Sequence, residues 1–131
     1  MKTYDRIGVG IIGTGRISDL HAIEYRNDPK AKIVALCDRD LGLARQRAAA
    51  WGLDTPFITD DIAALLKRPD VDLVEILLPH HLHKDAALAA IAAGKAVSLQ
   101  KPMCMNLAEA DEVVDAAKQA GVPFKVFENF I

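Results

Sequence analysis

The chain has 131 residues, of which 51% are hydrophobic and 26% charged, a size and composition typical of one soluble globular domain. Sixteen basic and 18 acidic residues leave a formal net charge of −2, which gives no electrostatic reason to expect nucleic acid or an anionic membrane as a partner. No run of about 18 apolar residues is present, so we expect no membrane span.

Short apolar runs alternate with longer helical stretches along the chain, and each helical stretch ends at a glycine or a proline. In chain order, we expect strands over 7–12, 32–37, 56–58, 71–78, 96–99 and 124–127, and helices over about 16–26, 41–51, 61–67, 83–93 and 106–120. The expected core includes Trp51, Leu65, Leu66, Ile91, Val113 and Val114. Six strands alternating with five helices predict one α/β domain over 1–131, with the doubly wound parallel sheet of the Rossmann fold.

A glycine-rich turn joins the first strand to the first helix. Its sequence is Gly13-Thr14-Gly15-Arg16-Ile17-Ser18. Gly13 permits the tight turn, and Gly15 lets the backbone approach a diphosphate because no Cβ stands in the way. The helix that begins near Arg16 points free N–H groups and its positive dipole end at the phosphates. We therefore expect residues 13–17 to bind the diphosphate of a dinucleotide, although Ser18 replaces the usual third Gly or Ala.

An acidic residue follows the second strand, where the adenosine ribose of a dinucleotide would lie. Asp38 comes 20 residues after Ser18 (38 − 18), which is the place for a carboxylate that accepts hydrogen bonds from the ribose. The alternative is that Asp38 caps the helix that follows it. Its charge would repel a 2′-phosphate and favours NAD, whereas Arg39 could pair with that phosphate and admit NADP.

Three short motifs follow one another in the second half of the chain. They are Leu78-Pro79-His80-His81-Leu82-His83, Ala92-Ala93-Gly94-Lys95-Ala96-Val97 and Gln100-Lys101-Pro102. In this order they resemble the motifs of the glucose–fructose oxidoreductase and inositol dehydrogenase family (Gfo/Idh/MocA), and the resemblance covers essentially the whole chain. It implies that a larger α/β substrate domain, absent from this chain, follows the Rossmann domain.

The resemblance also implies roles for individual residues. Lys101 would be the active-site lysine beside the nicotinamide and the substrate. The cofactor crevice would be lined by Leu78, Pro79, His80, His83 and Gln100. An ammonium at Lys101 could stabilise the alkoxide that develops as hydride leaves, whereas the alternative is a solvated surface lysine. Gln100 replaces the glutamate usual in the family, and His80 stands where asparagine is common.

The glycine turn and Asp38 predict a dinucleotide-binding domain, and the resemblance implies that it is the cofactor domain of an NAD(P)-dependent dehydrogenase that acts on a sugar, inositol or related polyol. The resemblance implies that a general base comes from the second domain, so we expect this chain to be inactive alone. Two alternatives stay open. One is a non-catalytic NAD-sensing or regulatory module, and the other is a domain for another adenine nucleotide or a methyl-donor cofactor.

Other residue types point to no metal and to a reduced environment. His80, His81 and His83 lack a cysteine or carboxylate partner at metal-ligand spacing, and Cys37 and Cys104 do not supply one. We therefore expect a cytoplasmic protein without a metal.

Residues 124–131 end the chain on apolar side chains, where free termini are usually polar. This segment predicts a chain cut from a longer protein and self-association through the exposed surface.

Overall fold

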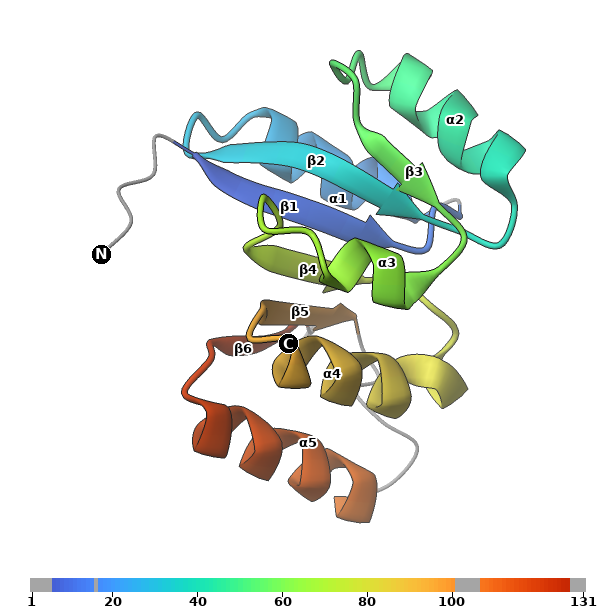
Figure 1. The fold of residues 1–131 in the computed structure, drawn as a ribbon. Coiled ribbons are helices and arrows are strands. Elements are labelled where there is room, and N and C mark those ends of the chain that lie inside the picture. Colours follow the sequence, from blue (N-terminus) through green and yellow to red (C-terminus); the bar gives the residue numbers. More distant parts are fainter. Residues whose placement is uncertain (1–5, 16, 101–106, 128–131) are drawn as a thin grey trace.

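The computed structural model describes residues 6–15, 17–100 and 107–127 (Figure 1). In these residues the strands are β1 (Ile7–Ile12), β2 (Ala31–Cys37), β3 (Phe57–Thr59), β4 (Leu73–Ile76), β5 (Ala96–Gln100) and β6 (Phe124–Phe127). The helices are α1 (Ser18–Arg26), α2 (Leu41–Ala50), α3 (Ile62–Leu66), α4 (His83–Ala92) and α5 (Leu107–Ala120), and the 3₁₀ turn η1 (His80–Leu82) precedes α4. The alternation of strands and helices is the one predicted from the sequence.

The strands form one parallel sheet in the order β3-β2-β1-β4-β5-β6. The chain moves outward from β1 to β3 and then returns to the other side of β1 with β4, so the winding direction reverses between β1 and β4. This order confirms the doubly wound Rossmann prediction. Ligands of such sheets bind outside the carboxyl ends of the strands at the point of reversal, which here lies between the loops that follow β1 and β4.

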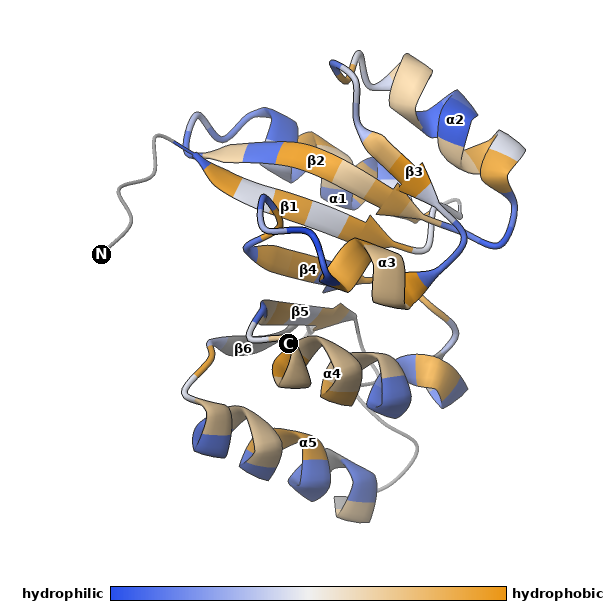
Figure 2. Cartoon of the chain, viewed as in Figure 1, coloured by the Kyte–Doolittle hydropathy of each residue, from blue (hydrophilic) through white to orange (hydrophobic). Residues whose placement is uncertain are grey.

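Helices cover both faces of the sheet. The helices α1 and α2 pack on one face through Ala22, Ala44, Ala48 and Trp51, and Figure 1 shows α1 behind β1 and β2. The helices α3, α4 and α5 cover the other face with leucine, isoleucine, valine and alanine side chains. Figure 2 shows apolar residues along the strands and hydrophilic residues on the outer side of α5. The burial of both sheet faces explains why the strands are apolar runs without alternation.

The expected core residues lie in these two layers, with one exception. Five of them are buried, namely Trp51, Leu65, Leu66, Ile91 and Val113, and Val114 is half-buried. Leu20 and Ile23 of α1 also have helical spacing, but both side chains are exposed. The buried face of α1 carries Ser18 and Ala22 instead.

A polar cluster also holds α1 to the sheet. Glu75 of β4 is fully buried, and its carboxylate accepts hydrogen bonds from the Tyr25 hydroxyl at 2.5 Å and from the Ser98 hydroxyl at 3.1 Å. A ring nitrogen of His21 lies 3.8 Å from the same carboxylate. Burial, together with the charge of Glu75, raises the pKa of Tyr25, so this hydroxyl stays protonated and donates. The buried carboxylate is thereby hydrogen-bonded, as a buried charge must be.

The element boundaries differ most from expectation at β4. The sequence predicts a strand over 71–78, whereas the ladder covers Leu73–Ile76. At the amino end, the Asp72 carboxylate accepts from the Gly8 N–H at 2.8 Å and so replaces a backbone partner. At the carboxyl end, Leu77 makes a last hydrogen bond to the Ile12 carbonyl at 2.8 Å. The chain then leaves the sheet and forms the loop that precedes α4.

Candidate cofactor site

The carboxyl ends of the three central strands meet at the turn after β1. The N–H of Gly13 donates to the Cys37 carbonyl of β2 at 2.8 Å, and the N–H of Leu77 donates to the Ile12 carbonyl at 2.8 Å. The turn is therefore fixed from both sides before it reaches α1. This brings the predicted diphosphate turn, Asp38 and the loop after β4 to one edge of the sheet.

The two glycines of the turn have different structural reasons. Gly13 has a φ of +100°, and a Cβ there would lie 2.9 Å from the Leu77 carbonyl oxygen. Gly15 is exposed, and a Cβ on it would meet nothing within 4 Å. Gly13 is thus required by the turn itself, whereas Gly15 leaves the open space that a diphosphate needs in order to approach the backbone.

The first helix begins at this open space. Its N-cap residue, Ile17, provides no side-chain cap, whereas α2 and α3 are capped by Asp40 and Asp61. The hydroxyl of Ser18 donates to the Gly15 carbonyl at 2.6 Å. Ser18 is buried, so the departure from the usual Gly or Ala is accommodated by an internal hydrogen bond. A helix start without a capping side chain suits an anion, because its first N–H groups point at the ligand.

Asp38 faces the glycine turn rather than the helix that follows it. Its Oδ2 accepts from the Thr14 N–H at 2.8 Å and from the Thr14 hydroxyl at 2.7 Å. Its Oδ1 accepts from the Asp40 N–H at 2.8 Å. The cap of α2 is Asp40, whose carboxylate accepts from the Leu43 N–H at 3.0 Å. The alternative that Asp38 caps this helix is therefore wrong.

The environment of Asp38 keeps its carboxyl group charged. Burial alone would raise the pKa of Asp38, but the hydrogen bonds from Asp40 and Thr14 outweigh it and hold the pKa below its ordinary value. A carboxylate has about four acceptor positions, and Asp40 and Thr14 use three of them. The remaining position on Oδ1 can accept a ribose hydroxyl. Arg39, the next residue, is exposed at the same edge.

A buried histidine holds the loop after β4 through a hydrogen bond to its backbone. His83 is 1% exposed, and its Nε2 lies 2.7 Å from the Leu78 carbonyl oxygen. The Leu82 N–H donates to the Pro79 carbonyl at 2.9 Å and closes the 3₁₀ turn η1. His83 thus fixes the shape of the loop in which Leu78 and Pro79 lie. A direct contact of His83 with a cofactor stays a prediction.

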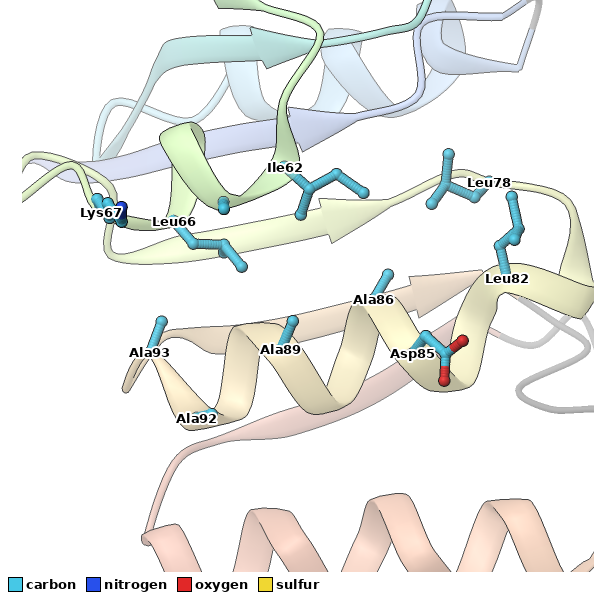
Figure 3. Close-up of a pocket in the computed structure, with 11 residues that line it drawn as sticks. Ile62, Leu66, Lys67, Leu78, Leu82, Asp85, Ala86, Ala89, Ala92 and Ala93 are labelled. Carbon is cyan, nitrogen blue, oxygen red and sulfur yellow. The ribbon is translucent and has the colours of Figure 1, made fainter.

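An apolar groove of about 620 Å³ opens beside this loop (Figure 3). It runs between α3 and α4, and Leu78 and Leu82 lie at one end, near Ile62. Small side chains form its floor along α4, among them Ala86 and Ala89. The groove was not predicted, although the alanine-rich sequence of α4 is a signal for it. The end of the groove at Leu78 and Leu82 lies beside the loop after β4 and is apolar enough for a flat aromatic ring.

Several predicted site residues have no described side chain. Arg16 and Lys101 lie outside the described residues. The backbone places His80 in η1 and Gln100 at the end of β5. The prediction of a catalytic lysine therefore rests on the sequence.

Within residues 6–15, 17–100 and 107–127, no helix could span a lipid bilayer. The same residues contain no group of three or more histidine, cysteine, aspartate or glutamate side chains placed to hold a metal ion.

The reversal of winding, the glycine turn and the acidic residue after β2 together define a dinucleotide-binding domain of the Rossmann class. Comparison with known families makes the assignment specific. Residues 7–128 match the Gfo/Idh/MocA family, described as an oxidoreductase family with an NAD-binding Rossmann fold. The chain belongs to this family, and the resemblance inferred from the three sequence motifs is confirmed.

Individual relatives agree with this assignment. The chain is 37% identical over 128 residues to D-apiose dehydrogenase of Paraburkholderia graminis, a match that covers 98% of this chain and 34% of the relative. GenD2 from gentamicin A biosynthesis, solved with NAD, superposes with a TM-score of 0.90 at 27% identity over 99% of this chain and 36% of that one. KijD10, a 3-ketoreductase of Actinomadura kijaniata solved with NADP, gives 0.84 at 26% identity over 92% and 37%. The chain thus spans about a third of the length of these relatives.

Proposed function

We propose that this chain is the cofactor domain of an NAD(P)-dependent dehydrogenase that acts on a sugar, inositol or related polyol. The observation that carries the proposal is the corner where the open face of Gly15 lies beside the ionised carboxylate of Asp38. A diphosphate and a ribose are adjacent groups in a dinucleotide. Gly15 offers open space for the diphosphate, and the neighbouring carboxylate of Asp38 offers an acceptor for the ribose.

The chain's residues divide the binding of the cofactor among them. The diphosphate would lie before Gly15 and the start of α1, and Oδ1 of Asp38 would accept a ribose hydroxyl. The adenine would enter the end of the groove formed by Leu78 and Leu82. The bound nicotinamide supplies a hydride acceptor or donor. Lys101 would hydrogen-bond the substrate oxygen and stabilise its developing negative charge.

We propose NAD rather than NADP as the preferred cofactor. The lowered pKa of Asp38 keeps a negative charge where the 2′-phosphate of NADP would lie. Arg39 is exposed at the same edge and could offset part of this repulsion. The preference is therefore a matter of degree, which a direct comparison of the two affinities measures.

The experiment is a titration of the full chain with NADH and with NADPH, followed by nicotinamide fluorescence. We expect tighter binding of NADH. In the Asp38→Ala variant, NADH should bind about tenfold more weakly because one charge-assisted hydrogen bond is lost, while binding of NADPH should weaken less or improve. Lys101→Ala should keep the affinity for NADH and abolish oxidation of the polyol by the enzyme that contains this chain. Equal affinities of the Asp38→Ala and unchanged proteins for NADH would refute the proposed ribose contact.

We propose self-association through the apolar segment 124–131 when no second domain covers it, on the basis of its composition. Sedimentation analysis of the chain should then show species larger than a monomer, and a monodisperse monomer would contradict the proposal.

We also propose a cytoplasmic location, supported by the buried free thiol of Cys37 and testable by cell fractionation.

A further inference from the structure

We propose that Arg47 of α2 is a positioning residue for the diphosphate turn, an inference that rests on the proposed function. Its Nε donates to the Thr14 carbonyl at 3.0 Å, and its Nη1 lies 3.3 Å from Oδ2 of Asp19. Arg47 lies 33 residues from Thr14 in the chain and belongs to none of the sequence motifs. One guanidinium thus connects α2 to the turn and to the first turn of α1.

The contact with Thr14 determines where the next N–H group points. The carbonyl of Thr14 and the N–H of Gly15 belong to one planar trans peptide and point in opposite directions. Because Arg47 holds the carbonyl, the Gly15 N–H is directed away from α2. The preceding peptide is fixed too, since the Thr14 N–H donates to Asp38 at 2.8 Å. The Gly15 N–H is therefore set in advance on an exposed residue, where it can donate to a phosphate.

The contact with Asp19 has an electrostatic effect on the same site. Asp19 lies in the first turn of α1, so its negative charge would repel an anion bound at the start of that helix. Arg47 pairs with one oxygen of Asp19, and the Trp51 indole N–H donates to the other at 2.8 Å. The two donors hold the carboxylate against α2 and offset its charge.

The ion pair between Arg47 and Asp19 contributes little to the stability of the fold. The Arg47 side chain is 24% exposed and that of Asp19 47% exposed, and ion pairs with this exposure contribute little to folding because water screens them. A lysine would provide a single point charge, whereas the planar guanidinium of Arg47 reaches two acceptors in fixed directions. The ion pair is therefore explained better by its effect on a bound anion than by a contribution to stability.

The test compares ligands that contain the diphosphate with one that lacks it. In the full chain, Arg47→Ala should weaken binding of NADH and of ADP-ribose about tenfold, because the Gly15 N–H is no longer held in its direction before binding and the charge of Asp19 is no longer offset. Its affinity for adenosine, measured by competition against NADH, should stay within about twofold because adenosine does not reach the turn. Arg47→Lys should restore part of the loss. Arg45→Ala removes an exposed arginine of the same helix and should leave all three affinities unchanged.

Thermal unfolding of each variant identifies folded protein, and Asp19→Asn provides a second route if Arg47→Ala does not fold. In Asp19→Asn the amide oxygen can still accept from Trp51, while the charge that Arg47 offsets is gone, so binding of NADH should be equal or tighter. Unchanged NADH affinity in Arg47→Ala, or equal losses for NADH and adenosine, would overturn the inference. Failure of the unchanged protein to bind NADH would instead overturn the proposed function, and the inference with it.

Discussion

Replacement of Gly13 by alanine should destabilise the protein far more than the same change at a glycine of similar conformation. Gly13 has a φ of +100°, and an L-residue at positive φ costs about 1–2 kcal/mol. The added Cβ would also lie 2.9 Å from the Leu77 carbonyl oxygen, and forced contacts in a packed region cost about 1–3 kcal/mol. The sum is about 2–5 kcal/mol, a large part of the stability of an ordinary domain.

The matched control is Gly94→Ala. Gly94 has a φ of +77°, but a Cβ there would meet nothing within 4 Å. This variant should show the conformational cost alone, about 1–2 kcal/mol. Urea unfolding of the two variants and the unchanged protein, followed by circular dichroism, gives both free energies. The difference between the variants isolates the cost of the contact with Leu77.

Equal free energies of unfolding for Gly13→Ala and Gly94→Ala would refute this reasoning. They would mean that the carbonyl of Leu77 moves away without cost. The structure argues against such freedom, because the Leu77 N–H is bonded to Ile12 and the next carbonyl, that of Leu78, contacts His83.

Three further results are expected from individual side chains. His83→Ala should lower the free energy of unfolding by about 1–3 kcal/mol, because it leaves the Leu78 carbonyl without its histidine partner, and urea unfolding measures the loss. Asp38 has a lowered pKa in the folded state, so its stabilising effect is present above the ordinary carboxyl pKa and disappears as the pH falls through the folded value. The stability difference between the unchanged protein and Asp38→Asn should therefore be largest near pH 7 and shrink below about pH 4, and a constant difference would contradict this. Burial, followed by the charge of Asp38, raises the pKa of Cys37 to about 11, so in a Cys104→Ser background this thiol should react with a thiol reagent at pH 8 only after unfolding.

The sequence predicts the parts of this protein whose signals are local. The turn at Gly13 and Gly15 is recognisable because the strand before it and the helix after it are contiguous in the chain. Asp38 is found because the carboxyl ends of neighbouring parallel strands meet at one edge, so its position at the end of β2 is enough to place it. The apolar strands are identified for a similar reason, since burial on both faces leaves continuous apolar runs.

Contacts between distant residues give no such signal. Arg47 and Thr14 are 33 residues apart, and Tyr25 and Glu75 are 50 apart. From the sequence alone, an arginine in an alanine-rich helix or a glutamate in a strand is predicted to be a solvated charge, because its partner is known only from the fold. Leu20 and Ile23 have the spacing of a helix, yet helical spacing alone does not say which face is buried, and both side chains are exposed.

The carboxylate of Asp38 holds the glycine turn in place and would also bind the ribose of the cofactor. Asp38 already accepts two hydrogen bonds from Thr14 on Oδ2. A ribose with two free hydroxyls can use the remaining position on Oδ1, but its second hydroxyl must compete with the Thr14 hydroxyl for Oδ2. Because the Thr14 N–H would keep its bond during this exchange, the turn can hold its shape while the side chain gives way. A dinucleotide could therefore bind at Asp38 and the glycine turn by replacing one hydrogen bond, the one from the Thr14 hydroxyl to Oδ2.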